Sequence, residues 1–292
     1  MTGSSQVWTD FLEKFPAAEV REGCEPCIFL GHNSTEATVL IHGLSDSPYF
    51  LKAIAAHLQF QGHTVLLPLL HGHGLCQPDG MRGISRHIWR HQVEFSVATA
   101  KRLAARVNIG GFSAGGALSV QHWCLHHSDI SGALLLFSGA LDLAGNVHLA
   151  GFKKWLGKSV LQMPIAVLQD RFGTALIGAN PYRYARRDYD GVAEFLRLLA
   201  ELDQQLKNPP ARIPIFAAHS QLDTIASLDA VRDIVEGCGT PTSLVHTIAA
   251  ANNVSHAQLV LDAPVAASGR ELEAANPVFD DMMHSLNSFL AR

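Results

Sequence analysis

Short apolar segments alternate along most of this chain with longer segments whose apolar residues recur at helical spacing. Strands that are apolar throughout and alternate with helices are typical of a mostly parallel sheet covered by helices on both faces. The sequence therefore predicts an α/β protein built around one such sheet. The expected strands are Cys27–Leu30, Thr38–Ile41, Thr64–Leu67, Val107–Ile109, Ala133–Phe137, Ile213–Ala217 and Leu244–Ile248.

Local signals place helices between these strands. Ser47 before Pro48 is a typical N-cap with proline at the first helical position, and Gly62 is expected to end that helix. Further helices are predicted over Arg86–Ala105, Ala114–His127, Thr224–Glu236 and Phe279–Leu290.

The alternation is interrupted between about Leu141 and Asn208, where strand signals are lost and basic residues are frequent. An insertion after a strand of such a sheet lies over the carboxyl ends of the strands, where ligands bind. We therefore expect a helical cap, or lid, at 141–207 on a core formed by 1–140 and 208–292. Ordinary crossover helices are the alternative, although the segment is long for one crossover.

Composition excludes several broad classes. The chain has 292 residues, 48% of them hydrophobic, which is enough for one large core. Its net charge is only −4 and no basic face is evident, so no nucleic-acid partner is expected. An odd count of five cysteines, no leader-like N-terminus and no long apolar run predict a cytoplasmic protein without stable membrane insertion. The oligomeric state is left open.

One short motif carries the chemistry. Val107–Gly116 reads VNIGGFSAGG, a strand that enters a helix through Gly-x-Ser-x-Gly. A serine hydroxyl must be exposed and deprotonated, and its oxyanion stabilised, before it serves as a nucleophile. A tight strand–turn–helix would expose Ser113 at its apex, and Gly111 and Gly115 would leave room for neighbouring backbone. Alone, the motif also fits a glycine-rich connection with an inert serine.

A carboxylate and a histidine follow two later strands. Asp223 lies on the loop after Ile213–Ala217, and His256 lies on the loop after Leu244–Ile248. Because the carboxyl ends of parallel strands share one edge of a sheet, these side chains are expected to meet Ser113 there. Ser113 would be the nucleophile, His256 the general base and Asp223 the carboxylate that orients it.

Two backbone amides are expected to form an oxyanion hole. The amide of Ala114 follows the nucleophile at a helix N-terminus, whose partial positive charge favours an anion. Gly43 would let the loop after the second predicted strand turn sharply and direct the amide of Leu44 inward. The side chains of His42 and Ser47 are expected to hold this loop and cap the following helix.

Other residues compete for these roles. Asp142 follows the strand Ala133–Phe137 and is an alternative acid, with Asp262 and Asp229 as weaker ones. His246 lies within a predicted strand and His284 within the last predicted helix, so both fit structural roles better than a catalytic one.

Two histidine pairs and one C-x-x-C segment are candidate metal or redox sites. The pairs His87/His91 and His122/His126 have a spacing that could ligate a metal on a helix face, but the zincin glutamate is missing. The C-x-x-C segment Cys24–Cys27 lacks a second pair and leads into a predicted strand. We therefore expect no metal site and no redox site at these positions.

With these pieces in order, the chain resembles serine α/β-hydrolases of the monoacylglycerol lipase, lysophospholipase and carboxylesterase group. The resemblance rests on VLIHGLSDSP (Val39–Pro48), LPLLHGHG (Leu67–Gly74), GFSAGG (Gly111–Gly116), HSQLD (His219–Asp223) and VSH (Val254–His256). It implies the α/β-hydrolase fold, with a mostly parallel eight-stranded sheet, a helical cap inserted after the sixth strand, and no cofactor. His71 and Ala114 depart from the residues frequent in the family, which leaves the substrate open.

The expected function is cleavage of carboxylic esters through an acyl-enzyme intermediate. Short- to medium-chain acyl esters or monoacylglycerol-like lipids are the substrates that the resemblance implies. A related hydrolase acting on amide, thioester or carbon–carbon bonds is an alternative, and a non-catalytic binding protein is another. Apolar residues of the expected cap could roof the pocket or form the cap's own core: Trp155, Leu156, Met163 and Leu168.

Overall fold

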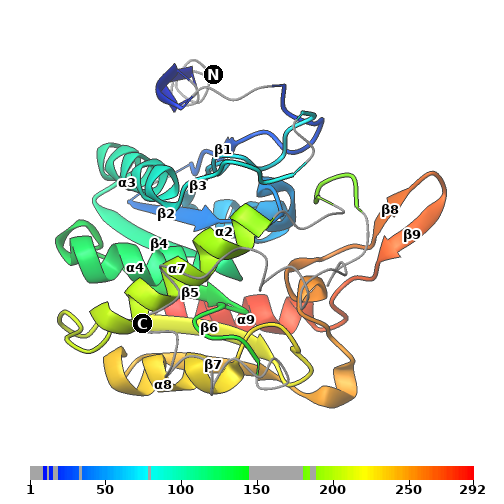
Figure 1. Ribbon diagram of the computed structural model, residues 1–292. Coiled ribbons are helices and arrows are strands. Elements are labelled where there is room, and N and C mark those ends of the chain that lie inside the picture. The colour runs from blue at the N-terminus through cyan, green and yellow to red at the C-terminus, as the bar shows by residue number, and fades with distance from the viewer. Residues whose placement is uncertain are drawn as a thin grey trace.

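Seven strands form the central sheet of the protein, in the order β1-β3-β2-β4-β5-β6-β7 (Figure 1). The computed structural model describes residues 9–11, 13–15, 19–32, 35–77, 80–144, 180–184 and 189–292. The strands are β1 (Cys27–Phe29), β2 (Glu36–Ile41), β3 (Thr64–Leu67), β4 (Arg106–Phe112), β5 (Leu134–Phe137), β6 (Ile215–Ser220) and β7 (Leu244–Ile248). Only β1 is antiparallel to its neighbour. Each predicted strand segment overlaps one of these strands, so the predicted α/β architecture is confirmed.

The strand count differs from the eight that the family resemblance implied, because the described residues contribute seven to this sheet. Before β1, the described chain pairs through an isolated bridge between Val20 and Leu75. A turn closed by the Cys24 amide on the Arg21 carbonyl follows at once and ends that pairing. The segment 141–207 therefore begins after the fifth strand, β5, and not after a sixth.

A separate two-stranded hairpin was not predicted. It consists of β8 (Val265–Ala267) and β9 (Arg270–Glu273) and projects from the body of the molecule (Figure 1). Ser268 and Gly269 join the two strands with φ angles of 52° and 74°. Positive φ at both central residues is the geometry that two-residue hairpin turns favour, so Ser-Gly was the local signal for it.

Helices cover both faces of the central sheet. One face packs against α3 (Arg86–Leu103), α4 (Ala114–His126), α7 (Tyr189–Gln205) and α8 (Leu228–Cys238), and the other against α2 (Lys52–Phe60) and α9 (Phe279–Leu290). Alternate strand residues divide between the two cores: Val39 and Ile41 point to the first face, and Leu40 points to the second. Short 3-10 helices complete the described elements: η1 (Pro48–Leu51), η2 (His127–Asp129), η4 (Ala250–Asn252) and η5 (Ala257–Val260).

Two predicted helix starts need correction. Ser47 occupies the N-cap position of η1, but its side chain makes no cap hydrogen bond. The helix expected from Thr224 begins only at Leu228, because the Asp223 carboxylate accepts the amides of the next turn and Ser227 then caps α8. The helix predicted at Phe279–Leu290 has the same bounds in the structure.

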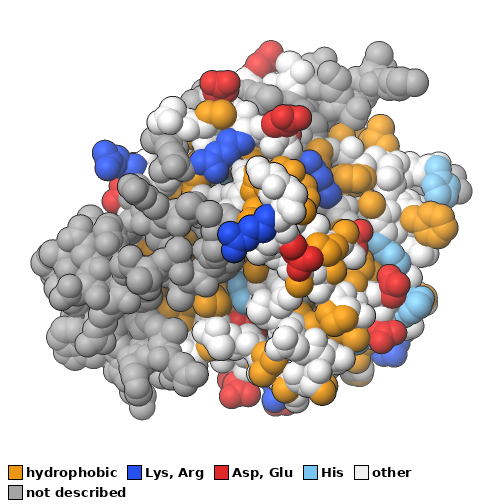
Figure 2. Space-filling model, turned by 90° about the vertical axis from the view of Figure 1, so that its right-hand side faces the viewer, with side chains coloured by type: hydrophobic (Ala, Val, Ile, Leu, Met, Phe, Trp, Pro, Cys, Tyr) orange, Lys and Arg blue, Asp and Glu red, His pale blue; other side chains and the backbone are white. Residues whose placement is uncertain are grey.

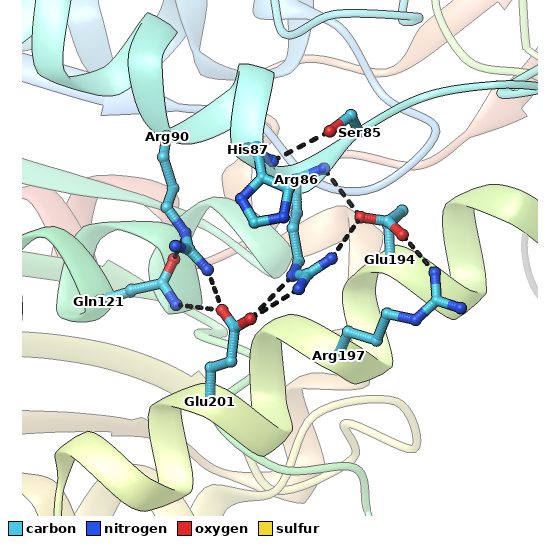
Figure 3. Close-up of polar contacts among 8 residues, drawn as sticks. All are labelled: Ser85, Arg86, His87, Arg90, Gln121, Glu194, Arg197 and Glu201. Atoms are coloured by element: carbon cyan, nitrogen blue, oxygen red, sulfur yellow. Dashed lines mark hydrogen bonds and ion pairs between the residues drawn. The ribbon is translucent and has the colours of Figure 1, made fainter. Parts of the chain in front are cut away.

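The helix α7 lies within the segment expected to be a cap, yet it packs in the helical layer of the core. Its residues Phe195, Leu198 and Leu202 share the apolar core with α3 and α4. Charged side chains join the same three helices at their surface (Figure 3). Residues 145–179, which include the four apolar residues proposed for a roof, lie outside the described residues, so the cap stays a prediction.

The described surface mixes charge and apolar area. On the face shown in Figure 2, Lys and Arg side chains lie among Asp, Glu and hydrophobic side chains. Within the described part of the chain, no helix combines the length and hydropathy that a membrane span requires.

Candidate active site

Ser113 occupies a sharp turn between β4 and α4. Its backbone has φ 54° and ψ −119°, a conformation that side-chain-bearing residues adopt only under constraint. The constraint is visible: its amide donates to the Phe137 carbonyl at 3.1 Å, and its carbonyl accepts from the amides of Gly116 and Ala140 at 3.0 and 2.9 Å. The turn thus presents the Ser113 hydroxyl at the carboxyl edge of the sheet.

The glycines around Ser113 are required by close backbone packing. A Cβ atom at Gly115 would lie 1.9 Å from the Ile41 carbonyl oxygen, and one at Gly111 would lie 2.4 Å from the same atom. Neither distance is compatible with a side chain. The Gly-x-Ser-x-Gly motif therefore lets β4 and α4 approach β2 closely enough to form the turn.

The structure brings Ser113, His256 and Asp223 together. His256 Nε2 lies 2.9 Å from Ser113 Oγ, and His256 Nδ1 lies 2.7 Å from Asp223 Oδ2. Because the carboxylate can only accept at Nδ1, the imidazole carries its proton there and leaves Nε2 free to accept from the serine hydroxyl. Proton removal from a serine requires this tautomer. His256 and Ser113 are 5% and 8% exposed, so the pair is largely shielded from water.

Asp223 is held as a carboxylate. Burial alone would raise the pKa of Asp223, but the neighbouring His256 and the Ala226 amide bound to the carboxylate lower the pKa to about 2. Asp223 Oδ1 accepts from the amides of Ile225 and Ala226 at 2.8 and 2.9 Å. A buried, ionised carboxylate can both orient the imidazole and stabilise its protonated form.

His219 also lies beside this carboxylate, and sequence reasoning assigned it no role. Its Nε2 is 3.1 Å from the Ala226 carbonyl oxygen and 3.4 Å from Asp223 Oδ2. Burial lowers the pKa of His219, which favours the neutral ring. Its place four residues before Asp223 in HSQLD was the available signal.

The competing candidates have other partners. Asp142 Oδ1 accepts the Leu143 amide at 2.6 Å, whereas the carboxylate at His256 belongs to Asp223. His246 Nδ1 lies 2.8 Å from Ser285 Oγ, as a structural histidine would. The weaker acids differ in setting: the Asp229 side chain is 89% exposed, 3.6 Å from Arg232, and Asp262 is exposed on the loop after η5.

The loop after β2 lies directly against Ser113. The Asp46 amide donates to the Gly43 carbonyl at 3.2 Å, which closes a turn around Leu44 and Ser45. A Cβ atom at Gly43 would lie 3.2 Å from Ser113 Cβ. The amide of Ala114 precedes the first helical hydrogen bond of α4, made by Gly116, so helix geometry leaves it without an intrahelical partner.

His42 holds this loop in place. Its Nδ1 lies 2.9 Å from the Gly43 carbonyl oxygen, and its Nε2 accepts the Leu70 amide at 3.1 Å. Burial, reinforced by the neighbouring His73, lowers the pKa of His42 well below its usual range. The neutral ring therefore ties two loops together.

The histidine pairs weighed as metal ligands have a carboxylate neighbour instead. His91 Nδ1 and His126 Nε2 lie 3.0 and 3.3 Å from Glu94 oxygens. In the described ranges, no group of three or more His, Cys, Asp or Glu side chains is arranged to hold a metal ion. All five cysteines are free thiols.

Comparison with known proteins finds a matching family model and a related lipase. The family model described as serine aminopeptidase, S33, matches residues 11–259. A thermostable monoacylglycerol lipase of Bacillus sp. (strain H-257) is 31% identical over 131 residues, and the match spans 45% of this chain and 49% of that lipase. The chain thus covers about half the length of this curated relative.

Solved structures agree on the fold. A structure reported for LipS and LipT, two metagenome-derived lipolytic enzymes, has a TM-score of 0.69 at 18% identity and covers 94% of this chain and 100% of its own. A soluble variant of the Saccharomyces cerevisiae monoglyceride lipase has a TM-score of 0.63 at 18% identity, with 91% of each chain covered. The chain therefore belongs to the serine aminopeptidase S33 family and has the α/β-hydrolase fold.

Proposed function

We propose that the protein is a serine hydrolase that cleaves carboxylic esters through an acyl-enzyme intermediate. One observation carries the proposal: an unbroken line of hydrogen bonds runs from Asp223 through His256 to Ser113, at the apex of a strained turn. The names of the relatives, lipases and monoacylglycerol lipases, support an ester as the small-molecule substrate.

The geometry supports the following first half-reaction. Ser113 Oγ attacks the ester carbonyl carbon while His256 Nε2 accepts the hydroxyl proton, and Asp223 stabilises the imidazolium that forms. The carbonyl oxygen becomes an oxyanion and accepts hydrogen bonds from the amides of Leu44 and Ala114. One such donor is worth about 3–4 kcal/mol of barrier.

Collapse of this intermediate completes acylation, and hydrolysis of the acyl-enzyme then regenerates the enzyme. The tetrahedral intermediate collapses, His256 gives its proton to the leaving alkoxide, and the alcohol departs from acylated Ser113. Water then takes the position of the alcohol, loses a proton to His256 and attacks the acyl carbon. Collapse of that intermediate returns the proton to Ser113 Oγ and releases the carboxylic acid.

Substrate class and location are part of the proposal. Short- to medium-chain acyl esters or monoacylglycerol-like lipids are the proposed substrates, and a panel that pairs each ester with its amide distinguishes this from peptidase activity. The free state of all five cysteines supports a reducing compartment such as the cytoplasm.

Substitution of the nucleophile tests the proposal. Ser113→Ala is expected to lower hydrolysis of p-nitrophenyl butyrate at least about 1000-fold, because no other hydroxyl replaces the attacking atom. Ser96→Ala is the matched control, since Ser96 is also buried and donates only to the Gln92 carbonyl within α3. Hydrolysis by Ser113→Ala at the rate of the control would contradict the assignment.

A further inference from the structure

Arg183 is a buried cation that contacts the loop that follows β2. Its side chain is only 1% exposed, and it pairs with the carboxylates of Asp46 and Glu273, which are 2% and 10% exposed. The guanidinium carbon also lies 4.3 Å from the centroid of the Phe50 ring. Separating a buried ion pair leaves uncompensated charges, so these three side chains restrict one another's positions.

The Asp46 carboxylate is part of the turn that carries the Leu44 amide. The Asp46 amide closes that turn by donating to the Gly43 carbonyl. The Asp46 side chain packs on the same turn, because its Oδ2 lies 2.4 Å from the position that a Cβ atom would take at Gly43. Ser45, between them, has φ 67° without being glycine. Such a backbone conformation persists only where the surroundings fix it.

The segment that contains Arg183 supplies this support at a second point. The Tyr184 amide donates to the Ser45 carbonyl at 3.0 Å, next to the ion pair between Arg183 and Asp46. The turn is therefore held at two neighbouring points, the Ser45 carbonyl and the Asp46 side chain. Both contacts are long-range in the sequence. Arg183 and Asp46, for example, are 137 positions apart.

Glu273 ties the same cluster to the β8–β9 hairpin. One of its oxygens accepts from both Arg183 and the Asn180 amide group, the latter at 2.7 Å, and Asn180 Oδ1 accepts the Tyr182 amide at 2.9 Å. The hairpin thus contacts Arg183 at Nη1, whereas Asp46 contacts it at Nε. Without the guanidinium, the buried carboxylates of Asp46 and Glu273 would both lose their cationic partner.

We propose that Arg183 is a positioning residue for the oxyanion hole: through Asp46 it fixes the turn that presents the Leu44 amide beside Ser113. Glu273 keeps Arg183 in that position. The inference rests on the proposed ester hydrolysis, because an oxyanion hole has a role only if a tetrahedral intermediate forms at Ser113.

The test compares turnover with binding of a compound that forms an oxyanion. We would measure kcat and KM for p-nitrophenyl butyrate, and the inhibition constant of an alkyl trifluoromethyl ketone, for Arg183→Met, Arg183→Lys and Asp46→Asn. Misplacing one donor is expected to lower kcat about 10- to 100-fold while KM changes less than about threefold. The ketone should lose affinity by the same factor as kcat/KM, which a general loss of stability would not cause.

Arg86→Met is the matched control. Arg86 also pairs with two carboxylates, Glu194 and Glu201, but lies between α3 and α7 (Figure 3). This variant should lower the melting temperature and leave kcat and ketone affinity unchanged. If Arg183→Met does not fold, Asp46→Asn and Arg183→Lys decide the question.

Two negative results have different meanings. Wild-type kcat and ketone affinity in the folded Arg183 and Asp46 variants would overturn the positioning role and leave ester hydrolysis intact. A wild-type protein that neither hydrolyses the ester nor binds the ketone would overturn the proposed function itself.

Discussion

The protein has arginine–carboxylate networks in two regions, and the two networks contact different kinds of backbone. At the carboxyl edge of the sheet, Arg183 is 1% exposed and contacts a turn with positive φ. On the helical face, the Arg86 and Arg90 side chains are 11% and 23% exposed and join regular helices through Glu194 and Glu201 (Figure 3). The second network has more ion pairs, and these join side chains of regular helices.

We infer that the position of a charged cluster, more than its number of ion pairs, decides whether it affects turnover or stability. At the edge, Arg183 pairs with the carboxylates of Asp46 and Glu273 beside the turn that follows β2, and the Asp223 carboxylate binds the imidazole of His256. On the helical face, the charges align α7 with α3 and α4. Substitutions at the edge should therefore change turnover, and substitutions on the face should change stability alone.

The largest effect is expected for Asp223→Asn. The asparagine oxygen can still accept the amides of Ile225 and Ala226, so its NH2 group would face His256 Nδ1. That contact favours the wrong imidazole tautomer, and kcat should fall about 1000- to 10,000-fold. Steady-state kinetics beside Glu201→Gln, which should keep kcat within about twofold, measures the contrast. Equal kcat values for the two variants would contradict the proposed difference between the edge and the helical face.

An intermediate effect is expected from the helical face. Glu201 accepts from Arg86, Arg90 and Gln121, so Glu201→Gln removes the central charge of that network. Because the site is partly exposed, the free energy of unfolding should fall by only about 1–3 kcal/mol. Urea denaturation followed by circular dichroism gives this value. A tenfold loss of kcat in the same variant would show that the face supports catalysis after all.

The smallest effect concerns the strained nucleophile turn. Ser113 has φ 54°, a conformation that glycine adopts readily and alanine does not. Ser113→Gly should therefore be more stable than Ser113→Ala by about 1 kcal/mol, although neither hydrolyses esters. The reverse order normally holds where φ is negative. Thermal denaturation of the two variants compares them, and a more stable alanine variant would indicate that the turn is not strained.

Much of the edge could be predicted from the sequence. Gly111, Ser113 and Gly115 form a contiguous motif, and Asp223 and His256 each follow an apolar strand, so parallel topology alone brings them to one edge. Their places depend on local pattern and strand order, which sequence retains.

The supports of that edge could not be predicted. Arg183 and Glu273 are 90 residues apart, and the latter lies on a hairpin with a weak signal. The sequence predicted a helical segment at 141–207 but not that α7 packs against α3 and α4, because any apolar face would suit its apolar residues. Pairings of this kind depend on tertiary packing and not on local sequence.

Covalent labelling tests the central claim most directly, that Ser113 is the activated nucleophile of an Asp223–His256 pair. The wild-type protein would be treated with a fluorophosphonate, digested and sequenced by mass spectrometry. We expect a single stoichiometric adduct on Ser113, absent from His256→Ala labelled for the same time. An adduct on a different residue, with Ser113 unmodified, would contradict it.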